Sequence, residues 1–343
     1  MRHAKHIGIN ELARRLGVAK STISKAISKH PDISEKTRQR VLTAAAHYQY
    51  QPSWIARAMT SKKTGLIGLV MHQPGSGYFI ELAGSIVAEA HRREYRVTLD
   101  FSGNNPETER EILTDYRHRH IDGVIITPSL KDSAAMLADA CGDMPYVIID
   151  HYLKGTKAPF VGNDFKEIGY LATRHLLELG HRHIAYLDGP INISSSRERL
   201  AGFLKACREF KTPVNRKWIC QGSFDESAGQ QQALMLMQNF HEITAFVCAS
   251  GPLAMGALQA AKMLGKTAPN DISVIGVSAL GNISAVSQNT HKIGRIALAT
   301  LCQKMTGAPV KSRQIIGSEL VARGTTASKN LSSEALSVGG CNR

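Results

Sequence analysis

The chain has 343 residues and a formal net charge of +14, with 43% hydrophobic and 20% charged residues. This length suggests two or three domains, and the composition is that of a globular protein, which excludes disorder as its main state. No run of about 18 uncharged apolar residues occurs, so we expect no membrane span. The amino end does not resemble a secretory signal, and the six cysteines form no Cys-x-x-Cys pair. We therefore expect a cytoplasmic protein with reduced thiols.

The positive charge is concentrated at the amino end of the chain. Residues 1–63 hold thirteen Lys or Arg and three acidic residues, a net charge of +10. The other 280 residues therefore carry only +4. A small basic module on a nearly neutral body indicates a polyanionic partner, most simply nucleic acid. A basic arm that serves only solubility is the alternative.

Three short helices are predicted within residues 1–50. Apolar residues recur at helical spacing in each, a glycine at position 17 ends the first, and Ser34 is a suitable N-cap for the third. Residues 51–63 form a linker with one short helix expected after Pro52.

From Thr64 onward, apolar strand-like runs alternate with amphipathic helical runs. This βαβα rhythm is typical of parallel sheets with helices on both faces, and nine strands fit two lobes better than one sheet. We expect the chain to switch between the lobes near Asp150–Phe160. The predicted strands are Leu66–Met71, Arg96–Phe101, Gly123–Thr127 and Tyr146–Ile149, then Phe160–Gly162, His183–Leu187, Trp218–Gly222, Ala245–Ala249 and Ser273–Val277.

The segment Gly8–Ser28 predicts two helices joined by a tight glycine turn. Small or apolar residues lie where the two helices must cross, and one outward face of the second helix is polar. Such a face can enter a DNA major groove, where hydroxyl groups and Lys reach base edges and phosphates. A merely solvated helix face is the alternative, which the tight turn and the basic charge disfavour. The residues of this face are Ser21, Ser24, Lys25 and Ser28.

These first 63 residues resemble the headpiece of the lactose-repressor (LacI) family of bacterial transcription regulators. The family's motifs occur here without a gap, as Gly17-Val18-Ala19, Thr22-Ile23-Ser24-Lys25, Ile33-Ser34-Glu35-Lys36-Thr37-Arg38-Gln39-Arg40-Val41 and Tyr50-Gln51-Pro52. The resemblance implies that bases are read by Lys20, Ser21 and Lys25, while Thr22 and Ser24 lie nearer to phosphates.

Two residues of the headpiece depart from the family pattern. Ala19 replaces the usual Ser, which caps the recognition helix and touches phosphate. Lys25 replaces the usual Arg, which can recognise guanine through two hydrogen bonds. Both departures affect the operator sequence that we expect, and not the mode of binding.

The linker resembles the family's hinge helix at Pro52–Met59. The resemblance implies that hinge helices from two subunits enter the minor groove, with Met59 as the apolar wedge at a base step. Packing within the linker is the alternative for Met59. Arg57, Lys62 and Lys63 would contact phosphates.

The resemblance continues to about Ala327 and implies two doubly wound parallel-sheet lobes similar to periplasmic binding proteins. Three crossovers would join the lobes, and His291–Lys304 and a late strand near Ile315–Leu320 would complete them. The expected domains are residues 1–50 for the all-α helix-turn-helix headpiece, 51–63 for the hinge, 64–327 for the effector-binding and dimerisation core, and 328–343 for a disordered tail rich in Ser and Gly.

The resemblance also implies an effector site at the carboxyl ends of the strands, where open α/β sheets bind ligands. Arg199 would hold hydroxyl or carboxylate groups of the effector, and Phe224 would stack on its ring. The other expected contacts are His72, Tyr78, Phe79, Thr127, Asp150, Asp164, Ser250 and Ser278.

Three acidic or amide positions of the family are missing from the second lobe. Ser250-Gly251 stands in place of Asn-Asp, Ser278-Ala279 in place of acidic residues, and the following loop is shortened to Gly281–Ser287. Acidic groups normally accept hydrogen bonds from sugar hydroxyls. Three alternatives follow: an anionic effector, a neutral ligand held by other residues, or a pocket that has lost ordinary sugar binding.

No phosphate loop, nucleophile elbow or paired nucleophile and base occurs, and His118 and His120 alternate with cations. We therefore expect no enzyme, no cofactor and no metal. We predict a repressor in carbohydrate metabolism, a homodimer that binds a palindromic double-stranded DNA operator and responds to a sugar, sugar acid or sugar phosphate. A small-molecule binding protein without specific DNA readout is the alternative.

Overall fold

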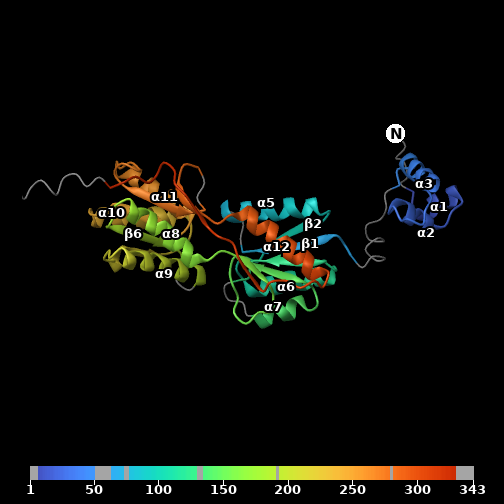
Figure 1. Ribbon diagram of the computed structural model, residues 1–343, viewed down its shortest axis with the longest axis horizontal. Coiled ribbons are helices and arrows are strands. Elements are labelled where there is room, and N and C mark those ends of the chain that lie inside the picture. The colour runs from blue at the N-terminus through green and yellow to red at the C-terminus, as the bar shows by residue number, and fades with distance from the viewer. Residues whose placement is uncertain are drawn as a thin grey trace, which may run out of the picture. The chain divides into compact units, whose positions relative to one another are not determined.

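The computed structural model describes residues 7–50, 63–72, 77–129, 134–190, 193–278 and 281–329 (Figure 1). It divides the chain into two compact units, Met1–Thr64 and Gly65–Arg343. Among the described residues, no helix combines the length and the apolar character needed to cross a membrane. The expected hinge residues Arg57 and Met59 lie outside the described residues.

The first unit contains the three predicted helices, α1 (Ile9–Leu16), α2 (Lys20–Ile27) and α3 (Glu35–His47). Helix α1 ends at Gly17, whose φ of +64° is left-handed and lets the chain turn sharply into α2. Helix α3 begins at Ser34, whose Oγ accepts a hydrogen bond from the Thr37 backbone N–H at 3.3 Å. The helices pack on a small buried core of Leu12, Ala13, Ile23, Ala26 and Val41.

The first lobe of the second unit is a parallel sheet with strand order β11-β5-β4-β3-β1-β2. Apolar side chains fill both faces of this sheet in two separate clusters. Helices α5 and α12 cover one face, and α6 and α7 cover the other. The elements are β1 (Leu66–Met71), α5 (Gly77–Arg92), β2 (Arg96–Phe101), α6 (Pro106–His118), β3 (Gly123–Ile126), α7 (Ala134–Cys141), β4 (Tyr146–Ile149), β5 (Phe160–Gly162), α12 (Thr290–Met305) and β11 (Arg313–Ile315).

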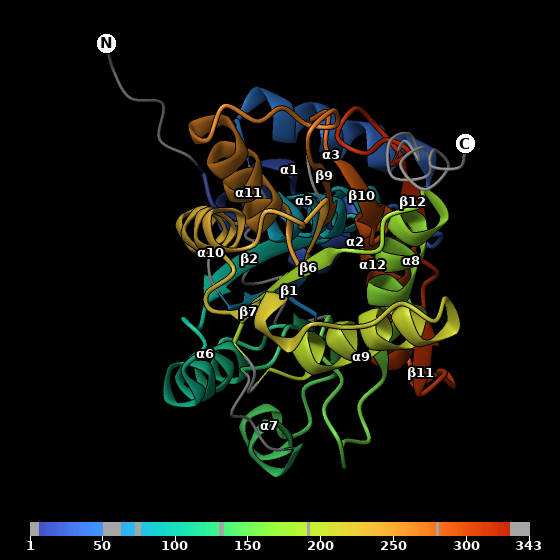
Figure 2. The ribbon, with the colours of Figure 1, turned by 90° about the vertical axis from the view of Figure 1, so that its left-hand side faces the viewer.

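The second lobe is a sheet with strand order β12-β10-β9-β8-β6-β7, in which only the pairing of β12 with β10 is antiparallel. Figure 2 shows the α8–α9 pair and the α10–α11 pair on opposite sides of strand β6. The elements are α8 (Phe165–Glu178), β6 (Ile184–Asp188), α9 (Ser194–Glu209), a short 3-10 helix (Arg216–Trp218), β7 (Ile219–Gln221), α10 (Glu226–Asn239), β8 (Ala245–Cys248), α11 (Gly251–Met263), β9 (Ser273–Val277), β10 (Ser284–Ser287) and β12 (Glu319–Val321).

The chain crosses between the lobes after β5, after β10, and between β11 and β12. The three crossing segments are bonded to one another. Asn163 Nδ2 donates to the Ile316 carbonyl at 2.8 Å, and Gln288 Nε2 donates to Asn163 Oδ1 at 3.4 Å. These contacts couple the crossing segments, so a change in the angle between the lobes must act on all three.

Three sequence predictions about the core are wrong. Phe160–Gly162 pairs with β4 and β11 and so belongs to the first lobe, which moves the switch from Asp150–Phe160 to Asn163. The strand expected near Ile315–Leu320 is two short strands, one in each sheet. The stretch expected to be a loop before Gln288 contains β10, which pairs with β9 and β12 and whose first three residues are buried.

Candidate DNA-binding face and ligand cleft

Helix α2 presents the polar face that the sequence predicts. Ile23 and Ala26 turn into the core, so the opposite side of the helix is directed to solvent. Thr22 is half-buried beside it. The predicted residues of this face, Ser21, Ser24, Lys25 and Ser28, are all exposed, and so is Lys20 beside them.

The start of α2 lacks a side-chain cap. Ala19 has the extended backbone of an N-cap residue, with φ −68° and ψ 150°, but its methyl group makes no hydrogen bond. Ser34 has nearly the same backbone angles, φ −60° and ψ 147°, and does cap α3. The departure from the family pattern at Ala19 therefore removes one hydrogen bond at the helix that carries the polar face.

Lys25 is paired within the protein. Its Nζ lies 3.0 Å from Asp32 Oδ2, and this contact holds the pKa of the Asp32 carboxyl below its usual value. Both side chains are exposed, so the pair contributes little to stability. A base or phosphate that uses Lys25 must replace Asp32 as its partner. Lys63, which we expect to contact a phosphate, is exposed.

Polar side chains meet where three strands of the first lobe end. His72 follows β1, Thr127 follows β3 and Asp150 follows β4. In the parallel register these strand ends lie side by side, because Val70 pairs with Ile126 and Ile126 with Ile148. All three polar residues are buried.

Several of these buried polar atoms have no partner in the part of the chain that the structure describes. They are both ring nitrogens of His72 and the hydroxyl of Thr127. Buried polar groups are normally hydrogen-bonded, so unpartnered ones at the carboxyl ends of the strands indicate a ligand site.

Helix α5 adds two aromatic residues to these polar side chains, and together they form the first lobe's wall of the candidate site. Tyr78 OH donates to Asp150 Oδ1 at 3.1 Å, and the Phe79 ring lies 5.9 Å from that of His72. Burial, and then His151, lowers the pKa of His72 to about 4, and burial, together with Asp150, raises the pKa of Tyr78. Both side chains are therefore neutral near neutral pH and act as hydrogen-bonding or coordinating groups.

Arg199 dominates the wall formed by the second lobe. It is buried, and its guanidinium carbon lies 5.2 Å from the ring centres of both Phe165 and Phe224. The helices α8 and α9 approach so closely here that a Cβ at Gly169 would lie 2.0 Å from the Arg199 carbonyl. The ring of Phe224 covers Gly189, where a Cβ would lie 2.2 Å from the ring. The absence of a side chain at Gly169 and at Gly189 thus allows Arg199 and Phe224 to occupy these positions.

Sequence reasoning missed Asp188, the acidic residue of this wall. It ends β6 and is fully buried, and burial raises its pKa to about 6 although Arg199 opposes the shift. The rule that selects Thr127 and Asp150, a polar residue at the end of a strand, would have found it. The second lobe therefore keeps one carboxyl group despite the three missing positions.

His151 was also missed, although it directly follows Asp150. Its Nε2 lies 3.2 Å from Asp150 Oδ2, and its ring centre is 5.1 Å from that of His72. The structure thus brings together three side chains of types that bind metal ions, namely His72, Asp150 and His151. Their spacing along the chain did not reveal this group.

Three expected ligand contacts use their polar atoms within the protein. Asp164 accepts from the backbone N–H groups at the start of α8, and Ser250 caps α11 and donates to the Phe224 carbonyl. Ser278 donates to Gln288 at 3.1 Å, next to the crossing segments. A contact of these three with an effector stays a prediction.

Two family models match the chain. Residues 8–53 match bacterial regulatory proteins of the lacI family, and residues 64–331 match periplasmic binding proteins and the sugar binding domain of the LacI family.

Curated relatives match along most of their length. The HTH-type transcriptional repressor PurR of Klebsiella pneumoniae (strain 342) is 30% identical over 319 residues, which cover 90% of this chain and 93% of that protein. PurR of Escherichia fergusonii is 31% identical over 309 residues, covering 87% and 90%.

Solved structures share the fold. A lac repressor dimer bound to operator and the anti-inducer ONPF has a TM-score of 0.83 at 24% identity, covering 94% of this chain and all of that chain. A complex of the transcriptional regulator CelR with cellobiose has a TM-score of 0.68 at 24% identity, covering 93% of this chain and all of that chain.

Proposed function

The chain belongs to the LacI family of bacterial regulatory proteins, and from this premise we propose that it is a repressor that binds a palindromic operator as a homodimer. The family makes it a DNA-binding transcription regulator with an effector-binding domain. Its relatives are named as regulators and not as enzymes. We place its action in the cytoplasm, with the DNA.

The exposed polar face of α2 is the observation that carries this proposal. Its hydroxyl and Lys side chains project from a compact basic unit that has no bulky apolar group on that face. In a dimer, two such helices would lie about one DNA turn, 34–36 Å, apart in successive major grooves. Arg57, Met59 and Lys63 would contact the minor groove and its phosphates between them.

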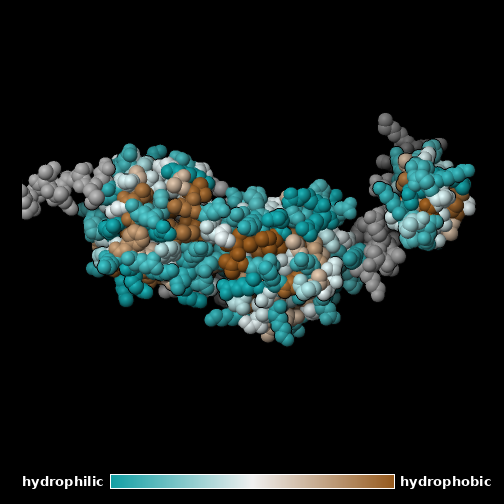
Figure 3. All heavy atoms as spheres, viewed as in Figure 1, coloured by the Kyte–Doolittle hydropathy of each residue, from teal (hydrophilic) through white to brown (hydrophobic). Residues whose placement is uncertain are grey.

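Exposed apolar side chains support the dimer. Figure 3 shows apolar patches on the otherwise hydrophilic surface of both lobes. On α5 the residues Ile80 and Val87 share one face, and β2, an edge strand, exposes Leu99 and Phe101. Apolar patches on an edge of this kind usually mark interfaces between subunits. The lac repressor structure that shares this fold is described as a dimer.

We place the effector where the polar residues of the two lobes approach each other, since Arg199 of the second lobe lies within electrostatic range of Tyr78 of the first. Arg199 and Phe224 provide a cation and an aromatic face on one side, and His72, Tyr78 and Asp150 provide hydrogen-bonding groups on the other. This set suits a sugar, sugar acid or sugar phosphate. Binding would change the angle between the lobes and bias the hinge, with a coupling of about 1–3 kcal/mol.

Selection of genomic fragments by the purified protein tests the proposal. We expect a palindromic site whose binding falls steeply as salt rises and shifts with one compound from a panel of sugars and sugar acids. Binding of random and genomic fragments with equal affinity would refute specific readout. A palindrome that responds to no compound would refute the effector assignment alone.

A further inference from the structure

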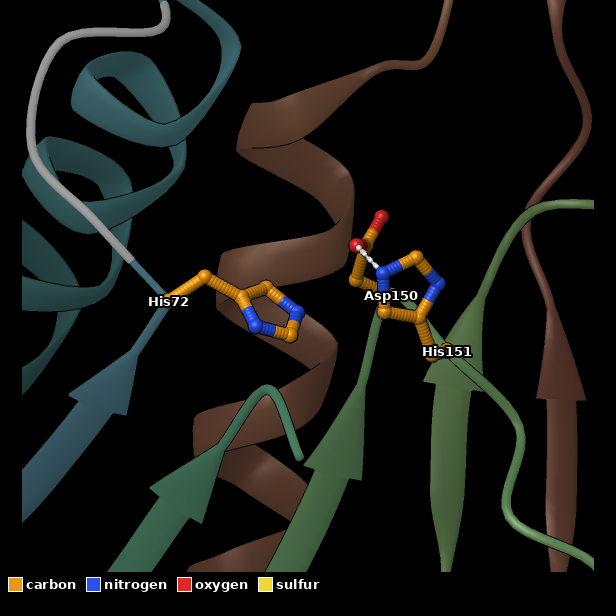
Figure 4. A group of neighbouring side chains, drawn as sticks. All are labelled: His72, Asp150 and His151. Atoms are coloured by element: carbon orange, nitrogen blue, oxygen red, sulfur yellow. Dashed lines mark ion pairs between the residues drawn. The ribbon is translucent and has the colours of Figure 1, made fainter. Parts of the chain in front are cut away.

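We propose that the first lobe binds a divalent transition-metal ion of the zinc class through His72, Asp150 and His151. One potential ligand atom from each side chain lies within 4.8 Å of the other two. Figure 4 shows the two imidazole rings and the carboxylate gathered at the ends of the strands β1 and β4. The proposal rests on the proposed function only in placing the ion at the regulatory cleft, since ion binding itself does not require DNA.

The fold brings these three side chains together. His72 follows β1, and the other two residues follow β4, with only β3 between these strands in the sheet. Asp150 has a φ of +66°, and the His151 N–H donates to the Ile149 carbonyl at 2.8 Å. This tight turn reverses the usual alternation of side chains, so two consecutive residues reach the same place. An L-residue in this backbone region is uncommon and costs free energy, which a function at Asp150 would justify.

The hydrogen bonds of the group leave lone pairs for a cation. His72 is only 7% exposed, and neither ring nitrogen has a partner among the described residues. Within the same residues, Nδ1 of His151 also has none. Asp150 contacts His151 with one oxygen, while its other oxygen accepts from Tyr78. A hydrogen bond that orients a carboxylate in this way is typical of metal ligands.

The donor set selects the class of ion. Two imidazoles and one carboxylate suit zinc and its neighbours, whereas magnesium and calcium prefer oxygen ligands. Tetrahedral bonds of about 2.0–2.2 Å place ligand atoms roughly 3.3–3.6 Å apart, so side-chain rotations must close the widest separation by about 1.3 Å. Three protein ligands leave the fourth position for an oxygen atom of water or of the effector.

Charges on both lobes bear on the site. Arg199 of the second lobe lies within electrostatic range of Tyr78 and disfavours a nearby cation. Asp188 is buried beside Arg199 and offsets that charge. Glu198 lies within electrostatic range of His151 and favours a cation.

Titration of the full-length, untagged protein with Co²⁺ tests the proposal, because cobalt in a zinc-type site gives visible absorption. The protein should carry His3→Ala and His6→Ala, so that histidines close to the amino terminus bind no metal. We expect one cobalt ion per chain. His72→Ala and His151→Ala should each weaken binding more than about 100-fold, beyond the roughly 10–100-fold cost of losing a residue that supports a ligand. Tyr78→Phe, which removes such a support, should cost about tenfold.

Controls separate the metal site from folding and from DNA binding. His118→Ala, an exposed histidine at the end of α6, should leave cobalt binding unchanged. Asp150→Asn keeps the shape of the side chain, and circular dichroism checks the fold of every variant. Cobalt binding that survives in both cleft histidine variants, or absent binding in the parent protein, would overturn the metal site. If the protein binds an operator but takes up no cobalt, the metal site is refuted and the proposed function is not. If it takes up cobalt at this site but selects no operator, the metal site is supported and the proposed function is refuted.

Discussion

Helix α2 begins at Ala19, and replacing this residue by Ser should stabilise the first unit. Ala19 is exposed and already has the backbone angles of Ser34, so a new hydroxyl can share the Thr22 N–H, which already donates to the Ala19 carbonyl at 3.0 Å, without repacking. A serine cap in place of alanine contributes about 1 kcal/mol, within a range of 0.5–2. For a unit of about 60 residues, that corresponds to a melting temperature roughly 4–8 °C higher.

Hydrogen exchange of the α2 backbone amides in the full chain measures this effect locally. About 1 kcal/mol should slow exchange roughly fivefold. The matched control is Ala46→Ser, the same substitution at an exposed position within α3, where serine offers no cap and costs about 0.5 kcal/mol of helix propensity. The two substitutions should therefore act in opposite directions. Equal exchange in Ala19→Ser and the parent protein would show that the start of α2 is satisfied in another way.

Three further predictions concern DNA and effector binding. Lys25→Ala should weaken discrimination between operator and random DNA, whereas Lys63→Ala should weaken both evenly; equal ratios in a titration would contradict these assignments. Arg199→Ala should abolish the effector response but leave operator binding intact, and an unchanged response would place the ligand elsewhere. Asp188 keeps its proton up to about pH 6 when folded but loses it above about pH 4 when unfolded, so it makes stability fall as pH rises through this window. In urea denaturation, the free energy of unfolding should therefore decrease between about pH 5 and pH 7.5 by about 1.5 kcal/mol less in Asp188→Asn than in the parent protein. Identical pH profiles of the two proteins would refute the shifted pKa.

The elements that follow a strong apolar pattern could be predicted from the sequence. The runs that form β1 and β4 have the predicted bounds, because each is buried on both faces of a parallel sheet. The edge strand β2 also has the predicted bounds, although it is partly exposed. Strand β10 could not be predicted, since Ser284–Ser287 is short and polar at both ends and is held by its two neighbours in the sheet. The lobe of β5 could not be predicted either, because strand order is a property of pairing and not of local pattern.

The candidate site was predicted one residue at a time and not as an arrangement. Resemblance selected Arg199 and Phe224, which the structure places in contact. It did not select His151, because a residue next to Asp150 in a regular strand would face the other way. Only the positive φ of Asp150 turns His151 toward His72, and no residue type in this segment demands that angle.

The serines that replace acidic residues in the second lobe retain one function of those residues. Ser250 still caps α11, as Asn or Asp would, and its hydroxyl also bonds to Phe224. Ser278 bonds to Gln288 beside the crossing segments. These hydroxyls are engaged within the protein, so the buried carboxyl groups of Asp150 and Asp188, at the carboxyl ends of β4 and β6, are the acidic candidates for ligand contacts. We infer that a ligand here offers hydroxyl donors to these carboxyl groups and acceptor oxygens to Arg199. The hydroxyl oxygens of a neutral sugar can accept a hydrogen bond from Arg199, and the carboxylate of a sugar acid accepts it more strongly.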